Sequence, residues 1–267
     1  MSALRLGDVA FRVLVCAIIL FLVLPVVVTM VVSFNAGGFV LPPTGFSLKW
    51  YEIAWSSNEF ISGIQVSLIL GVSASLLANI VAFMLVLSIY RYNARAKQAL
   101  TLLAMSPLLV PMTILGLSMY IFLAQLGLAG GKSALLMGHV VLTLPFAFRI
   151  LTASFQNYDG TLDEAAANVG ASPVRTLFSI TLPIIKTGLI ASFVLCFIIS
   201  WNDFALSVFL APSDWTPLPI QLYSYIKFQY DAAGAALVST LVLVSAVAIV
   251  LLDRLIGLQA AIGGSKG

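Results

Sequence analysis

The chain has 267 residues, of which 61% are hydrophobic and only 9% are charged, and its mean hydropathy is +1.10. A soluble domain carries about 25% charged residues, so this composition excludes soluble enzymes and free-standing binding modules and indicates a polytopic membrane protein. The net charge of +3 does not indicate nucleic-acid binding, because membrane proteins collect a basic excess in their cytoplasmic loops.

A helix needs about 20 apolar residues to cross the hydrocarbon core of a bilayer, and the chain contains six charge-poor runs of about that length. Strands of a membrane barrel would be about ten residues long with alternating polar positions, which these runs lack. We therefore expect an all-α membrane protein with six transmembrane helices. The expected spans are Val13 to Phe34, Ile64 to Ile89, Ala99 to Leu123, about Lys132 to Ser154, Thr187 to Ala211, and Ala232 to Leu252.

The first run follows Arg5 and Arg12, as the apolar region of a signal peptide would. The apolar region of a signal peptide has about 7 to 15 residues, however, and Val13 to Phe34 is longer and lacks a close cleavage site. We interpret it as a retained first span.

Several spans contain residues that are unusual in a straight apolar helix. Arg149 lies near one end of the fourth span, where its apolar stem can reach back to the headgroups. Pro25, Pro107, Pro111 and Pro145 also interrupt spans. Their kinks fit helices that splay around a cavity, but membrane helices also tolerate proline for packing reasons alone.

The distribution of the cations predicts the orientation in the membrane. With the N-terminus in the cytoplasm, ten cations lie inside and three outside, and the hairpin Tyr90 to Gln98 holds three cations and no acid. We therefore expect both termini in the cytoplasm. The inside set is Arg5, Arg12, Arg91, Arg95, Lys97, Arg149, Arg175, Lys186, Arg254 and Lys266, and the outside set is Lys49, Lys132 and Lys227.

The residue types that bind metals or perform redox chemistry are scarce. Cys16 and Cys196 lie in apolar runs without the spacing of a disulfide or metal site, so we interpret them as small apolar residues. His139 has no acidic companion on its own helix, which favours packing or an interhelical hydrogen bond over a proton relay.

The segment Gly131-Lys132-Ser133 matches the end of a phosphate-binding loop. Such a loop needs a glycine where the chain has Leu126, and it must join a strand to a helix. We therefore expect no nucleotide site or cofactor in this chain, and an energy-driven transporter would need a separate ATP-binding subunit.

The longest cytoplasmic loop, residues 155 to 186, is unlike a passive connector. Thr161 to Glu164 has the spacing of a capping box, which predicts the start of a short alanine-rich helix, and Gly170 suits the end of that helix. Ser172-Pro173 then predicts the start of a second helix, and Leu182-Pro183 leads into the fifth span. These residues alone fit equally a partner-binding helix or an ordinary amphipathic surface helix.

Four separated elements of this loop match one known motif. Glu164-Ala165-Ala166, Gly170, Ile180 and Leu182-Pro183 have the order and spacing of the E-A-A loop of permease subunits in bacterial ABC importers. The chain resembles this binding-protein-dependent permease family, with the MetI-like type I fold, over about residues 60 to 258. The resemblance implies that the loop is a coupling helix, which docks in a cleft of the ATP-binding subunit.

The resemblance implies specific residues and partners. Glu164, Ala165, Ala166, Gly170, Ala171, Leu182 and Pro183 would couple the chain to the ATPase. The expected partners are a second permease subunit, homologous or identical, two ATP-binding subunits that hold ATP and magnesium, a periplasmic substrate-binding protein, a small solute and membrane lipid. Nucleic acid is not among them, and the chain itself would not be an enzyme.

Asp203 is the only acid within an apolar span, about 24 Å along a helix from Thr187. Such a carboxylate normally faces a cavity or a bundle interior. With Trp201 and Asn202 it offers an aromatic face, an amide and a negative charge, which suit a cationic amine. The three residues would line the translocation path or form a gate, and a structural hydrogen bond is the alternative for Asp203.

Three further segments resemble the spermidine/putrescine-type permeases: Phe46 to Tyr51, Trp201 to Phe204, and Leu218 to Ser224. The expected function is therefore the permease of an ABC importer in a bacterial inner membrane, with a polyamine favoured as solute. Phosphonate, ferric iron, opine or amino-acid-like compounds and sugars are alternative solutes, and an ion-coupled secondary transporter is an alternative machine.

We expect three segments along the chain. Residues 1–60 hold the first span and first periplasmic loop, 61–258 the permease domain, and 259–267 a cytoplasmic tail.

Overall fold

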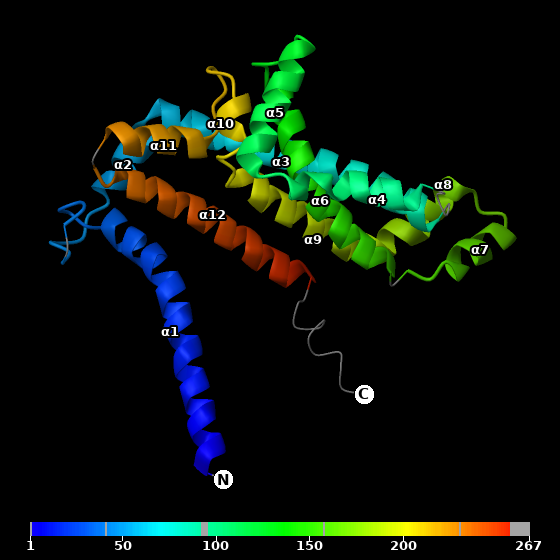
Figure 1. Ribbon diagram of the computed structural model, residues 1–267, viewed down its shortest axis with the longest axis horizontal. Coiled ribbons are helices and arrows are strands. Elements are labelled where there is room, and N and C mark those ends of the chain that lie inside the picture. Colours follow the sequence, from blue (N-terminus) through cyan, green and yellow to red (C-terminus); the bar gives the residue numbers. More distant parts are fainter. Residues whose placement is uncertain (1, 41, 92–95, 157, 230, 257–267) are drawn as a thin grey trace. The chain divides into compact units, whose positions relative to one another are not determined.

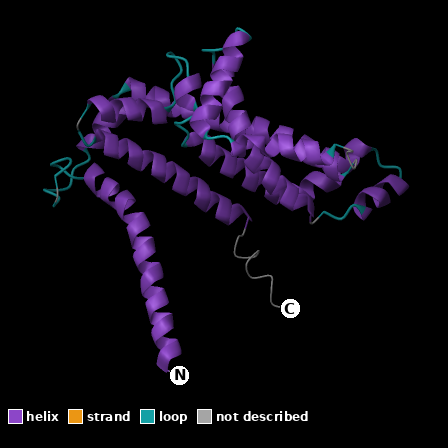
Figure 2. Ribbon diagram, in the orientation of Figure 1, coloured by secondary structure: helices purple, strands orange, loops and turns teal. Residues whose placement is uncertain are grey.

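The computed structural model describes residues 2–40, 42–91, 96–156, 158–229 and 231–256, and these parts consist of helices and connecting loops (Figures 1 and 2). Within them the only β pairing is an isolated bridge between Asn35 and Phe46. The α-helices are α1 (Ser2–Ser33), α2 (Lys49–Ser56), α3 (Asn58–Tyr90), α4 (Lys97–Met105), α5 (Met112–Gln125), α6 (Lys132–Gln156), α7 (Thr161–Asn168), α8 (Pro173–Thr176), α9 (Leu182–Trp201), α10 (Ser207–Leu210), α11 (Leu218–Phe228) and α12 (Ala233–Ile256). The 3₁₀-helix η1 covers Ser106–Leu109 and the π-helix η2 covers Leu177–Thr181.

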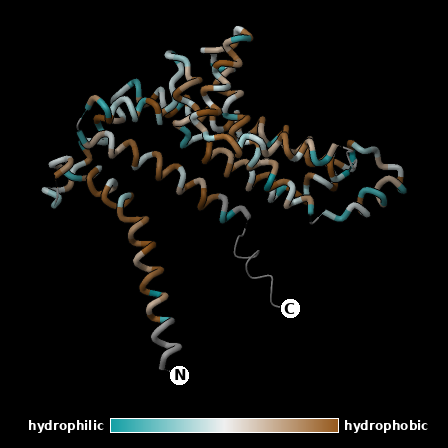
Figure 3. Tube along the Cα trace, in the orientation of Figure 1, coloured by the Kyte–Doolittle hydropathy of each residue, from teal (hydrophilic) through white to brown (hydrophobic). Residues whose placement is uncertain are grey.

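Among the described residues, five helical segments are long and apolar enough to cross a membrane, and one bent pair would make a sixth span. Apolar residues run along these helices, as Figure 3 shows for α1 in particular. Five of the six expected spans therefore have a matching segment. These segments are Asp8–Ser33, Asn58–Tyr90, Lys132–Gln156, Pro173–Trp201 and Ala233–Leu251.

The third expected span is not one straight helix. The helical path bends by 110° between Lys97–Leu109 and Met112–Gln125, a change of direction that can be followed in Figure 1. Pro111 has no backbone N–H for a continuing helix, and it disfavours the helical conformation at Val110, which is extended with φ −109° and ψ 131°. The uninterrupted run from Ala99 to Leu123 concealed this break, because hydropathy reports length and not direction.

The helix at the fifth expected span, Thr187 to Ala211, begins and ends at earlier residues than expected. A helical path begins at Pro173, passes through η2 and ends at Trp201, after which the chain breaks before α10. Pro183 explains the wide turn of η2, because its ring would clash with the carbonyl of Ser179 in a regular α-helix.

The chain divides into two compact units. The first contains Met1–Ile61 and Leu222–Leu243, and the second contains Ser62–Gln221 and Val244–Gly267. In the first unit, Val32 at the end of α1 packs with Ala232, Ala235 and Trp50. The indole of Trp50 donates a hydrogen bond to the carbonyl of Asn35 at 2.8 Å, which fixes the loop that follows α1.

The core of the second unit lies where α3 and α6 pack with α4 and α9. Ala74, Ala78 and Ala82 form a fully buried stripe on α3, and such small residues let membrane helices approach closely. Helix α6 packs along α9, where Gly188 lies against Ser154 so closely that a Cβ at that position would clash. Cys196 is buried in this core and its thiol donates to the carbonyl of Thr143 at 3.5 Å.

Candidate functional site

The start of α7 differs from the expected capping box. Thr161 is the first residue of the helix and its side chain caps nothing; Gly160 occupies the N-cap position. Asp159 supplies the side-chain acceptor instead, because its carboxylate accepts the backbone N–H of Thr161 at 2.9 Å. This backbone hydrogen bond lowers the pKa of Asp159. The acids Asp163 and Glu164 lie in the first turn, where their negative charges interact favourably with the positive end of the helix dipole.

The end of α7 confirms the expectation for Gly170. Its φ is +80°, in the left-handed region that favours glycine. The N–H of Gly170 donates to Ala167 at 2.9 Å, and the N–H of Ala171 donates to Ala166 at 2.9 Å. These two bonds form a Schellman motif, which gives the last carbonyls of a short helix their partners.

The expected start of the next helix is also confirmed. Pro173 is its first residue, and the hydroxyl of Ser172 accepts the backbone N–H of Arg175 at 3.3 Å. Leu182 and Pro183 begin α9 after the π turn. Since α8, η2 and α9 follow one another without a loop, this helix leads from the α7 turn into the fifth span.

A polar cluster ties α7 to the rest of the second unit. Asp163 forms an ion pair with Arg91, which follows α3, with 3.4 Å between Oδ2 and Nε. The hydroxyl of Tyr158 donates to Oδ1 of Asp163 at 2.8 Å and lies 3.3 Å from the hydroxyl of Thr181 in η2. Burial is the main cause that raises the pKa of Tyr158, so the phenol remains protonated at neutral pH. The cluster thus connects α7 to the end of α3 and to the start of α9.

The other side of α7 presents small and apolar residues to the exterior. Glu164, Ala165 and Gly170 are exposed, Ala166 is buried, and Val169 is 85% exposed. A hollow of about 600 Å³ lies between this segment and the following helix. Its lining combines residues of both: Leu162, Ala165, Ala166, Val169, Gly170, Ala171, Arg175, Thr176, Ser179 and Ile180. Four of the seven residues that the E-A-A resemblance implies, Ala165, Ala166, Gly170 and Ala171, therefore gather around one concave, mostly apolar surface.

The expected path residues Trp201, Asn202 and Asp203 lie at the end of α9 and do not converge. Trp201 is fully buried and its ring stacks on Phe197, with 5.9 Å between centroids. Asn202 is exposed and donates to the hydroxyl of Ser245 on α12 at 3.1 Å. Asp203 lies after the helix, not within it, because α9 ends at Trp201.

The carboxylate of Asp203 caps the next short helix. It accepts the backbone N–H groups of Leu206 at 3.4 Å and Ser207 at 2.9 Å, and the hydroxyl of Ser207 at 2.9 Å. Its side chain is 8% exposed. One acid therefore satisfies two backbone donors in the break after α9.

His139 joins both sides of this break. Its Nδ1 lies 2.7 Å from the hydroxyl of Ser200 on α9, and its Nε2 lies 2.8 Å from that of Ser207 on α10 and 3.9 Å from Asp203. The expected interhelical hydrogen bond is confirmed. Sequence reasoning missed that Asp203 is its companion, although ionisable residues inside spans tend to pair with each other.

Other residues of the site also escaped sequence reasoning. Arg91 counted only toward orientation, and Tyr158 and Asp163 carried no expected role. The pattern that could have found them is the position of Arg91 and Asp163 in two loops that are expected on the same side of the membrane, since opposite charges on neighbouring loops attract.

Comparison with known proteins identifies relatives of this site and fold. A model of the family described as "Binding-protein-dependent transport system inner membrane component" matches residues 74–260. The spermidine/putrescine transport system permease protein PotC of Escherichia coli K12 is 27% identical over 234 residues, which cover 88% of this chain and 89% of PotC. The putrescine transport system permease protein PotI of the same strain is 27% identical over 230 residues, covering 84% of this chain and 82% of PotI.

Solved structures give the same fold. A chain of a bacterial ABC transporter that imports alginate superposes with a TM-score of 0.70 at 17% identity and covers 95% of this chain and 96% of its own. A chain of the methionine ABC transporter MetNI superposes with a TM-score of 0.61 at 19% identity and covers 73% and 94%. These two likenesses establish the fold alone.

Proposed function

The chain belongs to the family of binding-protein-dependent transport system inner membrane components and is a permease of an ABC importer, and we propose that the solute it carries is a polyamine. The observation that supports this solute is the similarity to PotC and PotI, which extends over more than four fifths of each chain. As a family member the chain is a multi-pass inner-membrane transport component. We further propose that both termini are cytoplasmic, as the ten inward cations predict.

The exposed surface around α7 supports a docking role toward an ATP-binding subunit. We propose that Glu164, Ala165, Ala166, Gly170 and Ala171 enter a cleft of that subunit, while Leu182 and Pro183 begin the helix that leads away from it. The capped ends of α7 favour this role, because a short helix whose terminal groups are bonded moves as one body. ATP and magnesium would then bind the partner subunit.

The remaining partners follow from the same assignment. A second permease, homologous or identical, would complete the path, two ATP-binding subunits would meet the two coupling helices, and a periplasmic binding protein would deliver the solute. We propose that Trp201, Asn202 and Asp203 act as a gate at the break after α9, since Asp203 is bonded within the chain and Asn202 alone of the three is exposed.

Reconstitution tests the assignment. The permease, its ATP-binding subunit and its binding protein are placed in vesicles, and uptake of radiolabelled putrescine and spermidine is measured with and without ATP. We expect ATP-dependent uptake of at least one polyamine that requires the binding protein. Uptake that is driven by an ion gradient without ATP would refute the importer mechanism, and ATP-dependent uptake of a sugar or phosphonate in place of the amines would refute the solute.

A further inference from the structure

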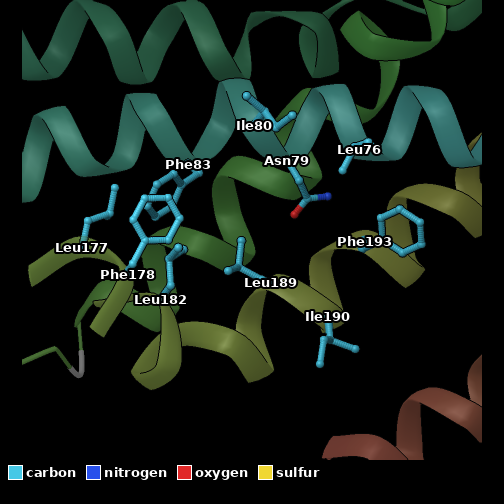
Figure 4. A pocket seen from close by; sticks show the side chains of 10 residues that line it. All are labelled: Leu76, Asn79, Ile80, Phe83, Leu177, Phe178, Leu182, Leu189, Ile190 and Phe193. Atoms are coloured by element: carbon cyan, nitrogen blue, oxygen red, sulfur yellow. The ribbon is translucent and has the colours of Figure 1, made fainter. Parts of the chain in front are cut away.

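Most of the large apolar side chains that the described residues expose lie on helices long and apolar enough to cross a membrane. The groove between α3 and the helical path of η2 and α9 is one example, since Leu76, Ile80 and Phe178 are exposed along it (Figure 4). A second set lies outside these helices, in residues 34–56, which follow α1. Its exposed members are Phe39, Val40, Phe46, Leu48, Ile53 and Trp55.

Asn35 holds the first part of this segment in one conformation. The residue is 1% exposed, and its side-chain amide is bonded entirely within the loop. Its Nδ2 donates to the carbonyls of Gly38 at 2.9 Å and Val40 at 2.7 Å. Its Oδ1 accepts the N–H of Gly37 at 3.2 Å and that of Thr44 at 2.9 Å. A loop that is already fixed loses little conformational entropy when its exposed side chains are buried.

The same segment is tied to the end of α1. Asn35 and Phe46 form the isolated β bridge that closes the loop. The ring of Phe46 stacks on that of Phe34, which directly follows α1, with 5.4 Å between the centroids. The hydroxyls of Ser33, the last residue of α1, and of Tyr51 on α2 lie 2.9 Å apart. The loop and the start of α2 therefore lie at the level where α1 leaves the membrane.

The charges of the sequence indicate what covers this surface. No charged residue occurs between Arg12 and Lys49, so the uncharged stretch continues past the end of α1 at Ser33. Charges resume at Lys49, whose Nζ lies 4.3 Å from the centre of the Trp50 ring. Lysine and tryptophan are typical of the membrane–water interface, because each has an apolar body and a polar end. The apolar surface of the loop is thus continuous with the exposed apolar surface of α1.

We propose that residues 34–56 form an interfacial anchor, which inserts its exposed apolar side chains into the headgroup region of the membrane at the C-terminal end of α1. The span Asp8–Ser33 is about 39 Å of helix and the hydrocarbon core is about 30 Å thick, so the length of α1 alone does not fix where its ends lie. The anchor fixes the end at Ser33. Its charged residues are Lys49 and Glu52, which cancel, so apolar burial and not lipid charge holds it in place.

Spin labels that report depth in the membrane test this anchor. The permease with Cys16→Ala is labelled at Phe39→Cys, Phe46→Cys or Asp214→Cys, assembled with its partner subunits and placed in vesicles of phosphatidylcholine. Cys196 is fully buried and stays in place, and Asp214 is an exposed control in the loop between α10 and α11. Oxygen concentrates in lipid and a nickel chelate in water, so the ratio of their effects on the label reports its depth. We expect a ratio at Phe39 and Phe46 about tenfold above that at Asp214, as apolar burial of a large side chain implies.

Two substitutions at Phe39 test insertion of the loop as one body. Phe39 is 62% exposed, so Phe39→Asp adds a charge to the loop without entering the core, and a charge is costly to bury. We expect Phe39→Asp to lower the ratio measured at a label on Phe46 severalfold, whereas the matched control Phe39→Leu keeps it. Addition of phosphatidylglycerol to the vesicles should leave all ratios unchanged, since the charges of the anchor cancel.

The possible outcomes separate a membrane anchor from a protein-docking surface. Ratios at Phe39 and Phe46 that equal the ratio at Asp214 would refute the anchor. Ratios that rise only after the substrate-binding protein is added would identify a docking surface for that protein and also refute the anchor. An unchanged ratio at Phe46 in the Phe39→Asp variant would show that the loop does not insert as one body and overturn the proposal. No solute is present in these measurements, so failure of the polyamine function leaves their result unaffected.

Discussion

The glycines at the two ends of α7 allow a sharp test of the coupling helix. Gly160 and Gly170 both have open space, since a Cβ at either position would meet nothing within 4 Å. Their backbones differ: Gly160 has φ −61°, which any residue adopts, whereas Gly170 has φ +80°. An alanine at either position therefore adds the same atoms to the surface, and only the backbone conformation distinguishes the two variants.

The expected magnitude follows from that difference. Alanine in the left-handed conformation costs about 1–2 kcal/mol, whereas alanine in place of glycine at an ordinary φ stabilises by about 0.4–1 kcal/mol. The two variants should thus differ by about 2 kcal/mol in the free energy of the native α7 turn, or roughly thirtyfold in its population. Gly170→Val should exceed this, because a β-branched residue is a genuine outlier at positive φ.

The assay compares transport with ATP hydrolysis in the reconstituted complex. We expect Gly160→Ala to retain the wild-type ratio of solute transported to ATP hydrolysed. Gly170→Ala should lower the ratio and weaken binding of the ATP-binding subunit, and Gly170→Val should do so further. Both ends of α7 are exposed, so thermal unfolding of the permease should change little. A Gly170→Val variant with a wild-type ratio would refute the docking role of this turn.

Three further predictions follow from the polar contacts. Asp163→Asn removes the ion pair with Arg91, and we expect it to weaken the attachment of α7 to the end of α3 by about 1 kcal/mol and to lower the ratio of solute transported to ATP hydrolysed. Asp159→Asn, at an exposed position, should keep the wild-type ratio. Equal ratios in the two variants would contradict this prediction. His139→Ala removes one hydrogen-bond partner from each of two buried hydroxyls, those of Ser200 and Ser207, and should destabilise the permease by about 2 kcal/mol, measured as a lower Tm in detergent; an unchanged Tm would count against the network. Burial, followed by its hydrogen bond to an aspartate, raises the pKa of Tyr225 to about 12 from an ordinary value of about 10, so its contribution to stability is complete below pH 10 and is lost as pH rises through about 12. Spectrophotometric titration of wild type and Tyr225→Phe checks this, and a phenol that ionises near pH 10 would refute it.

The sequence predicted the spans where composition alone decides the structure. The expected segment from Lys132 to Ser154 matches α6, because a long apolar run has few alternatives to a helix in lipid. Pro145 lies within that helix without ending it, whereas Pro111 coincides with a bend of 110°. Hydropathy could not separate these two prolines, since the outcome depends on which neighbouring groups can satisfy the freed carbonyls.

In the site, the contacts between residues close in sequence were predictable, and those between distant residues were not. The roles of Gly170 and of Ser172 and Pro173 were predictable, because a Schellman turn and an N-cap involve residues within a few positions of each other. The contact between His139 and Ser207 joins residues 68 positions apart, and nothing in either local sequence indicates the other. The capping box failed because Asp159, two residues before Thr161, accepts the backbone N–H of Thr161 that the pattern assigns to the side chain of Glu164.

The contacts of Asp163 give α7 a defined route to the membrane helices. Its ion pair reaches Arg91 at the end of α3, and Tyr158 links it to Thr181, the last residue of the π turn. From there α9 continues without a break to Trp201, about 30 Å away. A rigid helix carries a displacement of its first turn to its last, so we expect a movement of α7 to reach the end of α9, where His139 and Asp203 hold the break.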